Sequence, residues 1–518
     1  MEKRNQAAKL IIGAVVVIIA VLALAGIVAG RDIVYKASPL SREDVTYGEA
    51  EAPAATSADG TISANDWAAV YPHIVESLHM TSEYTDAQED YLEVDPYLKE
   101  LYAQYGFAKD YKSARGHEYT MLDVIETLRT GENSFASCLT CKTPNFTKYV
   151  EENGVAAYKE NFLKVHAKLM ANGGENVSCY TCHGNTPNVW HAVDPEKADS
   201  KTTNLTVTHT YVSKALGDNA KAIDPGVLAC GQCHIEYYFD PTTGETSMPY
   251  HSVEEMTPEA IYAYYQSIGF SDWTQTDSTG AKLLKVQHPE METYLYGKHA
   301  GTLSCADCHM PVVQDANDLT IYHSHSLVSP LDNEALLASC AECHGDTDMV
   351  AFVHNIQDRV TAEEKRVGNK LAAFRQVLTD AVQAGMLSDA VLDDLREVYR
   401  EAQWFFDFCY VENSEGAHNS DLSMHCLEVA EALVNAGTEE LNAANDLITL
   451  GQAIDQANGK VDVSVIAEAR GMLEEAQKFF DLCYAGASDT PRHAALSSQY
   501  LKNAQSLIKQ ATQKLAAK

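Results

Sequence analysis

Hydrophobic and polar residues divide the first part of the chain into three stretches with different patterns. Residues 10–30 are uncharged and largely apolar, which predicts a membrane-spanning helix or the core of an export signal. Residues 31–66 are rich in Ala, Ser, Glu, Asp and Gly with little apolar periodicity, so we interpret them as a solvated linker. Aromatic and apolar residues return at Trp67 and Tyr71, where we place the start of the folded body.

The sequence around the first apolar run indicates export. Basic residues precede the run, at Lys3, Arg4 and Lys9. Positive charge at that place puts the start of the chain in the cytoplasm and the rest outside. The run is longer than the about 7–15 apolar residues of a cleaved signal and reaches the about 20 of a spanning helix. We therefore expect residues 1–30 to be an uncleaved anchor, with a cleaved signal ending near Ala23-Leu24-Ala25 as the alternative.

The last third of the chain has a helical pattern and repeats itself. From about Glu363 the composition shifts to Ala, Leu, Glu, Gln and Lys with few prolines, which predicts long helices over residues 363–518. Residues 402–410 (AQWFFDFCY) match residues 476–484 (AQKFFDLCY), an offset of 74 from 402 to 476. We interpret this region as two copies of a long helical hairpin.

Composition permits a packed protein and argues against one class of partner. The 518 residues are 46% hydrophobic and 21% charged, which excludes wholesale disorder. There are 38 Lys and Arg against 73 Asp and Glu, so the formal net charge is −35. A surface this acidic repels phosphate backbones, and we expect no nucleic-acid partner.

Ten of the 13 cysteines form five C-x-x-C pairs, four of which are followed directly by histidine. The sequence C-x-x-C-H attaches a c-type haem, and its histidine ligates the iron. Zinc sites and thioredoxin-like redox pairs need no histidine at this place. We therefore predict haem at four motifs, namely Cys179, Cys182 and His183; Cys230, Cys233 and His234; Cys305, Cys308 and His309; and Cys340, Cys343 and His344.

The remaining pair, Cys138 and Cys141, is followed by Lys142. It is either a degenerate or redox pair, or the attachment site of a fifth haem with a lysine amine as ligand. An amine binds iron only when it is neutral, which burial and the metal both favour. Carrier haems are ligated on both faces, whereas a haem that performs chemistry keeps one face open. An atypical ligand on one haem among five therefore indicates a separate task for that haem.

This combination of motifs resembles the ammonia-forming pentahaem cytochrome c nitrite reductases. The resemblance covers roughly Tyr71 to the His418 region and rests also on residues 115–131, 230–239, 285–290 and 412–419. It implies a mainly α fold with long loops packed around five c-type haems, followed by long C-terminal helices. It further implies the six-electron reduction of nitrite to ammonia at the lysine-ligated haem, fed by four bis-histidine haems.

The resemblance also implies the residues around the catalytic haem. Lys142 would be its proximal ligand, and Arg129, Tyr237 and His288 would surround its open face. Nitrite is an anion, so in a chain of charge −35 it needs a local positive pocket. We expect Arg129 and a protonated His288 to provide that pocket, and Tyr237 to donate a proton or hydrogen bond.

A structural calcium ion is a further implication of the resemblance. Glu236 and Gln287 would bind it through side-chain oxygens, and Tyr237 and Lys285 through backbone oxygens. Ligation by oxygen alone is what a hard cation prefers, so the set is chemically coherent.

The four carrier haems need distal histidines from elsewhere in the chain. The resemblance implies His117 for the haem at Cys230 and His325 for the haem at Cys179, with His323 as a near rival. It also implies His299 and His418 for the haems at Cys305 and Cys340. We expect His299 to ligate the haem at Cys340 and His418 the haem at Cys305, but the sequence leaves the opposite assignment open.

The overall organisation follows from these features. We expect a pentahaem core over residues 67–362 and a helical region over residues 363–518 that provides a homodimer interface. The protein would be exported, at the outer face of the cytoplasmic membrane or in the periplasm, with a membrane quinol-oxidising multihaem cytochrome as electron donor. Alternatives are an electron conduit without substrate, or a related reductase acting on hydroxylamine or sulfite. Three cysteines lie outside the motifs, namely Cys409, Cys426 and Cys483. Two of them would form a disulfide and leave one thiol, or all three would stay as buried thiols.

Overall fold

The structure is a computed structural model that describes residues 53–82, 88–183, 211–484 and 491–517. The expected anchor at residues 1–30 and most of the expected linker lie outside these ranges. Within the described ranges, no helix has both the length and the apolar character needed to cross a membrane.

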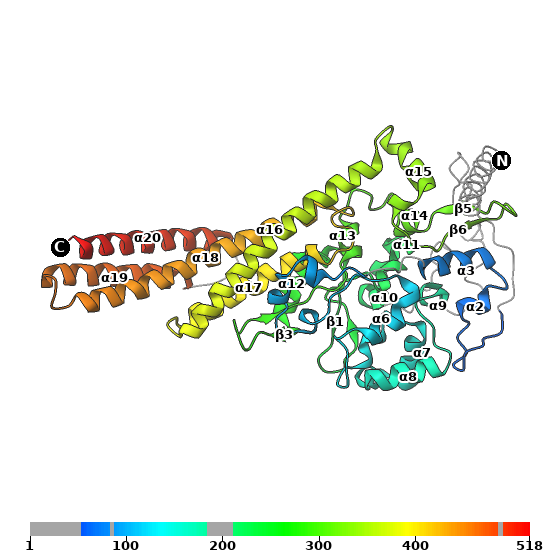
Figure 1. Cartoon of the computed structure of the whole chain (residues 1–518), viewed down its shortest axis with the longest axis horizontal. Coiled ribbons are helices and arrows are strands. Elements are labelled where there is room, and N and C mark those ends of the chain that lie inside the picture. Colours follow the sequence, from blue (N-terminus) through cyan, green and yellow to red (C-terminus); the bar gives the residue numbers. More distant parts are fainter. Residues whose placement is uncertain (1–52, 83–87, 184–210, 485–490, 518) are drawn as a thin grey trace, which may run out of the picture.

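The first two thirds of the described chain fold into a body of short helices joined by long loops (Figure 1). Its α-helices are α2 (Ala64–Trp67), α3 (Pro72–His79), α4 (Tyr91–Val94), α5 (Leu98–Leu101), α6 (Thr120–Glu126), α7 (Pro144–Asn153), α8 (Phe162–Ala171), α9 (Cys179–His183), α10 (Tyr211–Leu216), α11 (Pro225–Leu228), α12 (Pro258–Ser267), α13 (Glu290–Leu295), α14 (Cys305–His309) and α15 (Glu334–His344). The expected mainly α fold with long loops is confirmed.

The strands of the described chain form three short antiparallel pairs. They are β1 (Tyr238–Phe239) with β2 (Thr246–Ser247), β3 (Trp273–Thr274) with β4 (Lys282–Leu283), and β5 (Val312–Gln314) with β6 (Ile321–His323). Each pair is a local hairpin and none extends into a larger sheet. The pairs therefore stiffen individual loops of the body.

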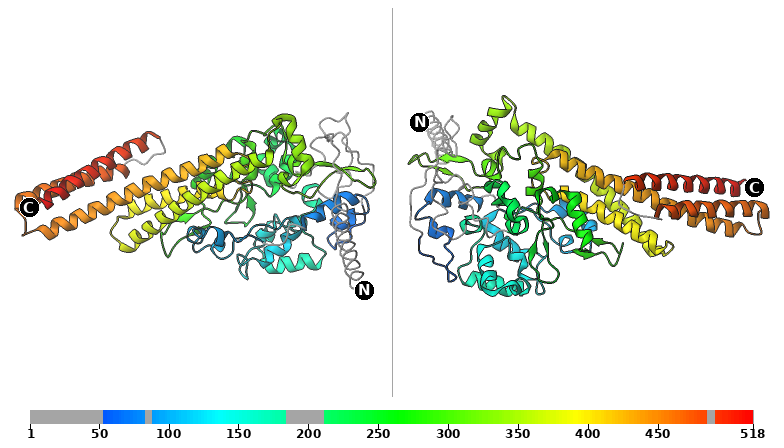
Figure 2. Two further views of the ribbon diagram at one scale, coloured as in Figure 1. Left: turned by 45° about the horizontal axis from the view of Figure 1, so that its top comes forward. Right: turned by 180° about the vertical axis from the view of Figure 1, so that it is seen from behind.

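Five long helices follow the body and extend away from it (Figures 1 and 2). They are α16 (Met349–Ala384), α17 (Asp389–Tyr410), α18 (Ser420–Ala457), α19 (Val463–Tyr484) and α20 (Pro491–Ala516). Local signals set their ends: the side chain of Ser388 accepts a hydrogen bond from the backbone of Val391, and Gly385 ends α16 with a φ of 62°. Helix α16 is continuous across residue 363, so the helical region begins earlier, at Met349.

The 74-residue offset recurs in the three-dimensional arrangement. Helix α17 begins at 389 and ends at 410, and α19 begins at 463 and ends at 484. Equivalent side chains are buried in both copies, as with Phe406 and Phe480. The long helix α18 packs on α16 and α17, and also on α19 and α20. The second copy therefore extends the first along a shared helix (Figure 2).

One hydrophobic core joins the body to the long helices. Trp404 and Phe406 of α17 are fully buried and belong to the same cluster as Tyr250 and Tyr265 of the body. The Tyr265 and Trp404 rings meet edge to face with centroids 5.6 Å apart. Helix α17 is therefore part of the body's core as well as of the helical extension.

Candidate active site

Four histidines of C-x-x-C-H motifs each face a second histidine from another part of the chain. The ring centroids are separated by 6.5 Å for His117 and His234, 6.3 Å for His183 and His325, 6.1 Å for His299 and His344, and 6.4 Å for His309 and His418. The structure thus brings together all four expected distal histidines with motif histidines.

The spacing within each pair suits one metal ion between the rings. A bond from a metal to an imidazole nitrogen is about 2 Å long, so two such bonds place the ring centres about 6 Å apart. Of the two arrangements that the sequence leaves open, the structure has His299 beside His344 and His418 beside His309. His325 lies opposite His183, as expected for that pair.

The second nitrogen of several rings is held by an oxygen atom. Nδ1 lies 2.8 Å from the His323 carbonyl oxygen in His325, 3.1 Å from the Val328 carbonyl oxygen in His309, and 2.6 Å from Glu412 Oε1 in His418. Such contacts fix the tautomer and leave Nε2 for a metal. Nε2 of His325 is indeed buried without a hydrogen-bond partner. These residues therefore fit bis-histidine haem ligation.

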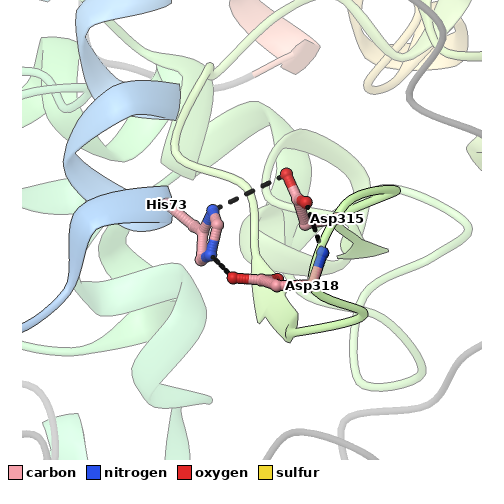
Figure 3. A group of neighbouring side chains, drawn as sticks. All are labelled: His73, Asp315 and Asp318. Atoms are coloured by element: carbon pink, nitrogen blue, oxygen red, sulfur yellow. Dashed lines mark hydrogen bonds and ion pairs between the residues drawn. The ribbon is translucent and has the colours of Figure 1, made fainter.

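The hairpin that precedes His325 is attached to helix α3 (Figure 3). His73 contacts Asp318 through Nε2 at 2.8 Å and Asp315 through Nδ1 at 3.7 Å. Its ring also stacks on Tyr322 of β6, with centroids 5.4 Å apart. Both ring nitrogens of His73 face a carboxylate of the β5–β6 turn, so the group holds the hairpin in place.

Lys142 lies beside the first C-x-x-C pair. Its carbonyl oxygen accepts a hydrogen bond of 2.8 Å from the Thr120 hydroxyl, which fixes the loop after the pair. Burial raises the pKa of the Cys138 thiol, and the nearby charges of Lys142 and Arg129 oppose that rise. Both expected cations therefore lie close to this pair.

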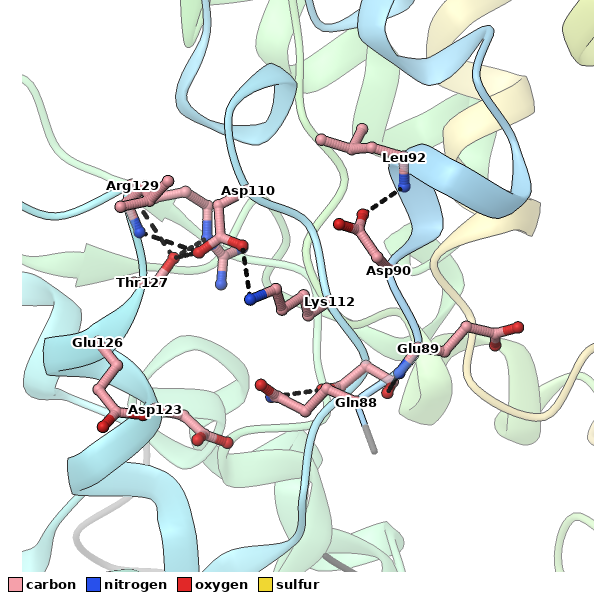
Figure 4. A network of polar contacts seen from close by, with 12 residues as sticks. Gln88, Glu89, Asp90, Leu92, Asp110, Lys112, Asp123, Glu126, Thr127 and Arg129 are labelled. Carbon is pink, nitrogen blue, oxygen red and sulfur yellow. Dashed lines mark hydrogen bonds and ion pairs between the residues drawn. The ribbon is translucent and has the colours of Figure 1, made fainter. Parts of the chain in front are cut away.

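Arg129 is exposed and held from two sides. Its guanidinium carbon lies 4.3 Å from the centre of the Phe107 ring, and its Nε donates to the Thr127 hydroxyl at 3.1 Å. That hydroxyl donates to Asp110 at 2.7 Å, and the backbone of Leu128 donates to the same carboxylate at 2.9 Å (Figure 4). The two residues directly before the arginine are therefore fixed by Asp110.

Lys285 is a buried cation at the start of the segment that leads to His288. Its ammonium group contacts Asp407 of α17 at 3.1 Å and donates to the Val286 carbonyl oxygen at 2.6 Å. It also lies 4.9 Å from the centre of the Phe107 ring. Two cations therefore contact one aromatic ring. Neither Phe107 nor Asp407 can be predicted from the sequence, because nothing in its local pattern marks either contact.

The expected calcium ligands converge around one buried carboxylate. Glu236, with 1% exposure, accepts 2.6 Å and 2.8 Å hydrogen bonds from the Gln287 backbone and the Tyr265 hydroxyl. The side-chain nitrogen of Gln287 donates to the Lys285 carbonyl oxygen at 2.9 Å. Burial raises the pKa of Glu236 well above its ordinary value. A bound cation would offset the cost of burying this carboxylate, so the donor set fits calcium.

His288 and Tyr237 provide uncharged polar groups. Burial lowers the pKa of His288 to about 4, which outweighs the attraction of Glu290. Removal of an imidazolium from water costs more than Glu290 returns, which favours a neutral ring. The protonated ring expected from the sequence stays a prediction. Burial and the neighbouring Cys141 raise the pKa of Tyr237 well above its ordinary value, so the phenol keeps its proton.

Glu290 lies beside His288 and is ionised. Burial favours its neutral form, but the neighbouring His234 lowers its pKa to about 2. The sequence predicts no role for this residue.

The family described as cytochrome c552 has a sequence model that matches residues 63–516. The chain belongs to the cytochrome c552 family. The four C-x-x-C-H motifs are those of a multihaem c-type cytochrome.

A solved structure has a fold similar to that of this cytochrome c552 family member. It is the cytochrome c nitrite reductase of Desulfovibrio desulfuricans ATCC 27774, described for two calcium sites in its catalytic subunit. The TM-score is 0.61 at 23% sequence identity, over 73% of this chain and 86% of that chain. The similarity confirms the expected fold class, with long helices following the body.

The cysteines outside the motifs lie in the helical region. Cys409 and Cys426 are buried thiols, and Cys409 donates a hydrogen bond of 3.2 Å to Glu364. Cys483 donates to the Phe479 carbonyl oxygen at 3.6 Å. Of the two readings of the sequence, the structure has thiols here and not a disulfide.

Proposed function

We propose that this protein reduces nitrite to ammonia at a haem attached through Cys138 and Cys141, with Lys142 as proximal ligand. The reaction consumes six electrons and eight protons per nitrite and releases ammonium and two water molecules. Membership of the cytochrome c552 family supports the cofactor, and the similar fold of a nitrite reductase supports the reaction. The observation that carries the proposal is the contrast between one lysine motif and four histidine motifs with facing histidines.

The four paired histidine sites would hold electron-carrying haems. Each of these pairs would supply both histidine ligands of one haem iron, which would leave no position for a substrate. Haem would supply redox-active iron, and the haem held by Lys142, which lacks a second histidine, would be the one that can bind nitrite. Five covalently bound haems are thus part of the proposal.

Arg129 would bind the anionic substrate in a chain that otherwise repels anions. Its side chain is exposed and already directed by Phe107 and Thr127, so little entropy is lost when it meets nitrite. Tyr237, which keeps its proton, would donate a hydrogen bond or proton to an oxygen atom. His288 would act as a neutral imidazole that accepts a proton at one nitrogen and donates from the other.

Calcium would be held by Glu236 and Gln287 through side chains and by Tyr237 and Lys285 through carbonyl oxygens. Tyr237 follows Glu236 directly, and His288 follows Gln287, so an ion at this place would fix both substrate-facing side chains. Its charge would add to the positive field of the pocket.

The remaining assignments concern the setting of the reaction. We propose export to the outer face of the cytoplasmic membrane or to the periplasm, with anchoring by residues 1–30. A quinol-oxidising multihaem cytochrome of the membrane would donate the electrons, and the long helices would form a homodimer interface. The pentahaem core would span residues 67–362, which include the start of α16.

An anaerobic assay with a reduced dye tests the lysine motif. Lys142→Ala should lower nitrite turnover at least about 100-fold while the paired-histidine haems keep their low-spin spectra. Lys164→Ala, at an exposed position of α8, is the matched control and should match the unaltered protein. Turnover that survives Lys142→Ala would overturn the assignment. An unaltered protein that reduces no nitrite would favour an electron conduit, or a reductase acting on hydroxylamine or sulfite.

A further inference from the structure

Glu290 lies between two imidazoles that belong to different sites. Its Oε2 is 3.7 Å from Nδ1 of His234, and its Oε1 is 3.9 Å from Nδ1 of His288. The two rings have centroids 6.1 Å apart. His234 is the motif histidine of the haem at Cys230, and His288 faces the proposed substrate pocket. One carboxylate thus lies beside both sites.

The carboxylate is also held by the loop between α17 and α18. Asn413 donates to Glu290 Oε1 from its side-chain nitrogen and, at 3.4 Å, from its backbone nitrogen. The preceding residue, Glu412, holds His418. Two consecutive residues of one loop therefore support groups beside three of the proposed haem sites.

One atom of each residue is buried without a hydrogen bond, namely Nδ1 of His288 and Oε2 of Glu290. The carboxylate oxygen 3.9 Å from His288 Nδ1 is Oε1, which also accepts from Asn413, whereas Oε2 faces Nδ1 of His234. Buried polar atoms in folded proteins are almost always paired, so the Glu290 carboxylate is the natural partner of the His288 ring. If Nδ1 of His288 is directed toward the carboxylate, the Nε2 atom points to the other side of the ring.

We propose that Glu290 is a positioning residue that orients His288 and His234 together, so that the substrate-facing imidazole and the ligand of a neighbouring carrier haem share one carboxylate. The role of His288 in this proposal rests on the proposed function, whereas the role of His234 rests on haem attachment alone.

The two contacts have separate consequences. A carboxylate on the outer nitrogen of a ligating imidazole makes the ring a stronger donor, which stabilises the oxidised metal and lowers its reduction potential. The contact with His288 fixes the direction of its other nitrogen toward the substrate. Loss of that direction lowers kcat more than it raises KM, because proton transfer depends on orientation more than anion binding does.

Glu290→Gln in the holoprotein distinguishes these two effects from a general loss of structure or of haem. The amide keeps the size of the side chain but removes its negative charge. We expect full haem content. One low-spin haem should have a more positive midpoint potential and altered electron paramagnetic resonance g values. The kcat should be at least about 10-fold lower, with KM changed less than about 3-fold. Glu259→Gln, whose carboxylate contacts the exposed His425, is the matched control and should leave all of these unchanged.

Asn413→Ala provides a second variant if Glu290→Gln loses haem. It removes the side-chain donor to Glu290 and should move the same potential in the same direction by a smaller amount. If a haem-replete variant shows unchanged potentials and a kcat within about 2-fold of the original, the proposal is overturned. If the unaltered protein reduces no nitrite, the proposed function fails. The midpoint potential of the haem at Cys230, compared between Glu290→Gln and the unaltered protein, then decides alone whether Glu290 orients His234.

Discussion

The guanidinium group of Arg129 lies over the ring of Phe107, with 4.3 Å between the guanidinium carbon and the ring centre. The ammonium group of Lys285 lies 4.9 Å from the same ring centre. Phe107 therefore connects the proposed substrate-binding cation to the segment that carries the proposed calcium ligands. A cation held by an aromatic face keeps its charge while losing rotational freedom, which suits a group that must bind a small anion.

Phe107→Leu should weaken nitrite binding. Loss of a cation–π contact costs about 1 kcal/mol, which corresponds to a KM for nitrite raised about 5-fold with kcat less affected. Steady-state kinetics over a range of nitrite concentrations measures both values. Phe479→Leu changes a phenylalanine of the second repeat, away from the site, and should leave KM unchanged. An unchanged KM in Phe107→Leu would show that the ring does not position Arg129.

The buried pair of Lys285 and Asp407 should contribute strongly to stability. Asp407→Asn leaves the Lys285 charge buried without its counter-charge, which costs about 3–5 kcal/mol. We expect Tm to fall by several degrees in differential scanning calorimetry of the holoprotein. The repeat supplies the control, because Asp481 occupies the equivalent position and instead contacts Gln477 in an exposed setting. Equal effects of Asp407→Asn and Asp481→Asn would contradict the importance of the buried pair.

The buried side chain of Glu364 should make stability depend on pH. Burial raises its pKa to about 7 from an ordinary value of 4.5, so the folded protein binds a proton that the unfolded chain releases in this range. The associated stability is present below pH 4.5 and is lost as the pH rises through 7. Glu364→Gln should remove this loss, which is at most about 3 kcal/mol. Denaturation midpoints at pH 5 and pH 8 measure it.

The control for that prediction is Glu439→Gln, at an exposed position of α18. It should keep the pH dependence of the unaltered protein. An unchanged difference between pH 5 and pH 8 in Glu364→Gln would mean that this carboxyl is not the titrating group.

Removal of calcium should reduce both stability and nitrite turnover. A chelator such as EGTA takes away the cation that offsets the buried Glu236, so Tm should fall, and added Ca²⁺ should restore it. Glu236→Gln removes the charge that holds the ion. That variant should lose the response to chelator and to added Ca²⁺. A Tm that is insensitive to calcium in the unaltered protein would contradict the site.

Motifs and repeats can be predicted from the sequence, because they depend only on the spacing of residues along the chain. The motif around Cys230 and His234 lies within five residues, and the repeat at Phe406 and Phe480 is visible as a fixed offset. Residues 285–290 carry part of the resemblance to the nitrite reductases, but the sequence predicts no role for Glu290. Helical periodicity likewise predicted the long helices after the body.

Contacts between distant segments could not be predicted in the same way. The pairing of His418 with His309 depends on how α18 packs on the body, so the sequence left it open. Asp407 and Asp481 occupy equivalent positions of the repeat, and only the tertiary fold places one of them against Lys285. The lowered pKa of His288 follows from burial, a property that single-sequence patterns do not contain.

The electron count per nitrite tests the proposed reaction most directly. Purified holoprotein, a reduced dye of known concentration and ¹⁵N-labelled nitrite are combined without oxygen, and dye oxidation, nitrite loss and ¹⁵N-ammonium are measured together. We predict six electrons consumed and one ¹⁵N-ammonium formed per nitrite lost. Nitrite loss with fewer electrons and a gaseous nitrogen product, or no nitrite loss at all, would contradict ammonia formation at the haem of Lys142.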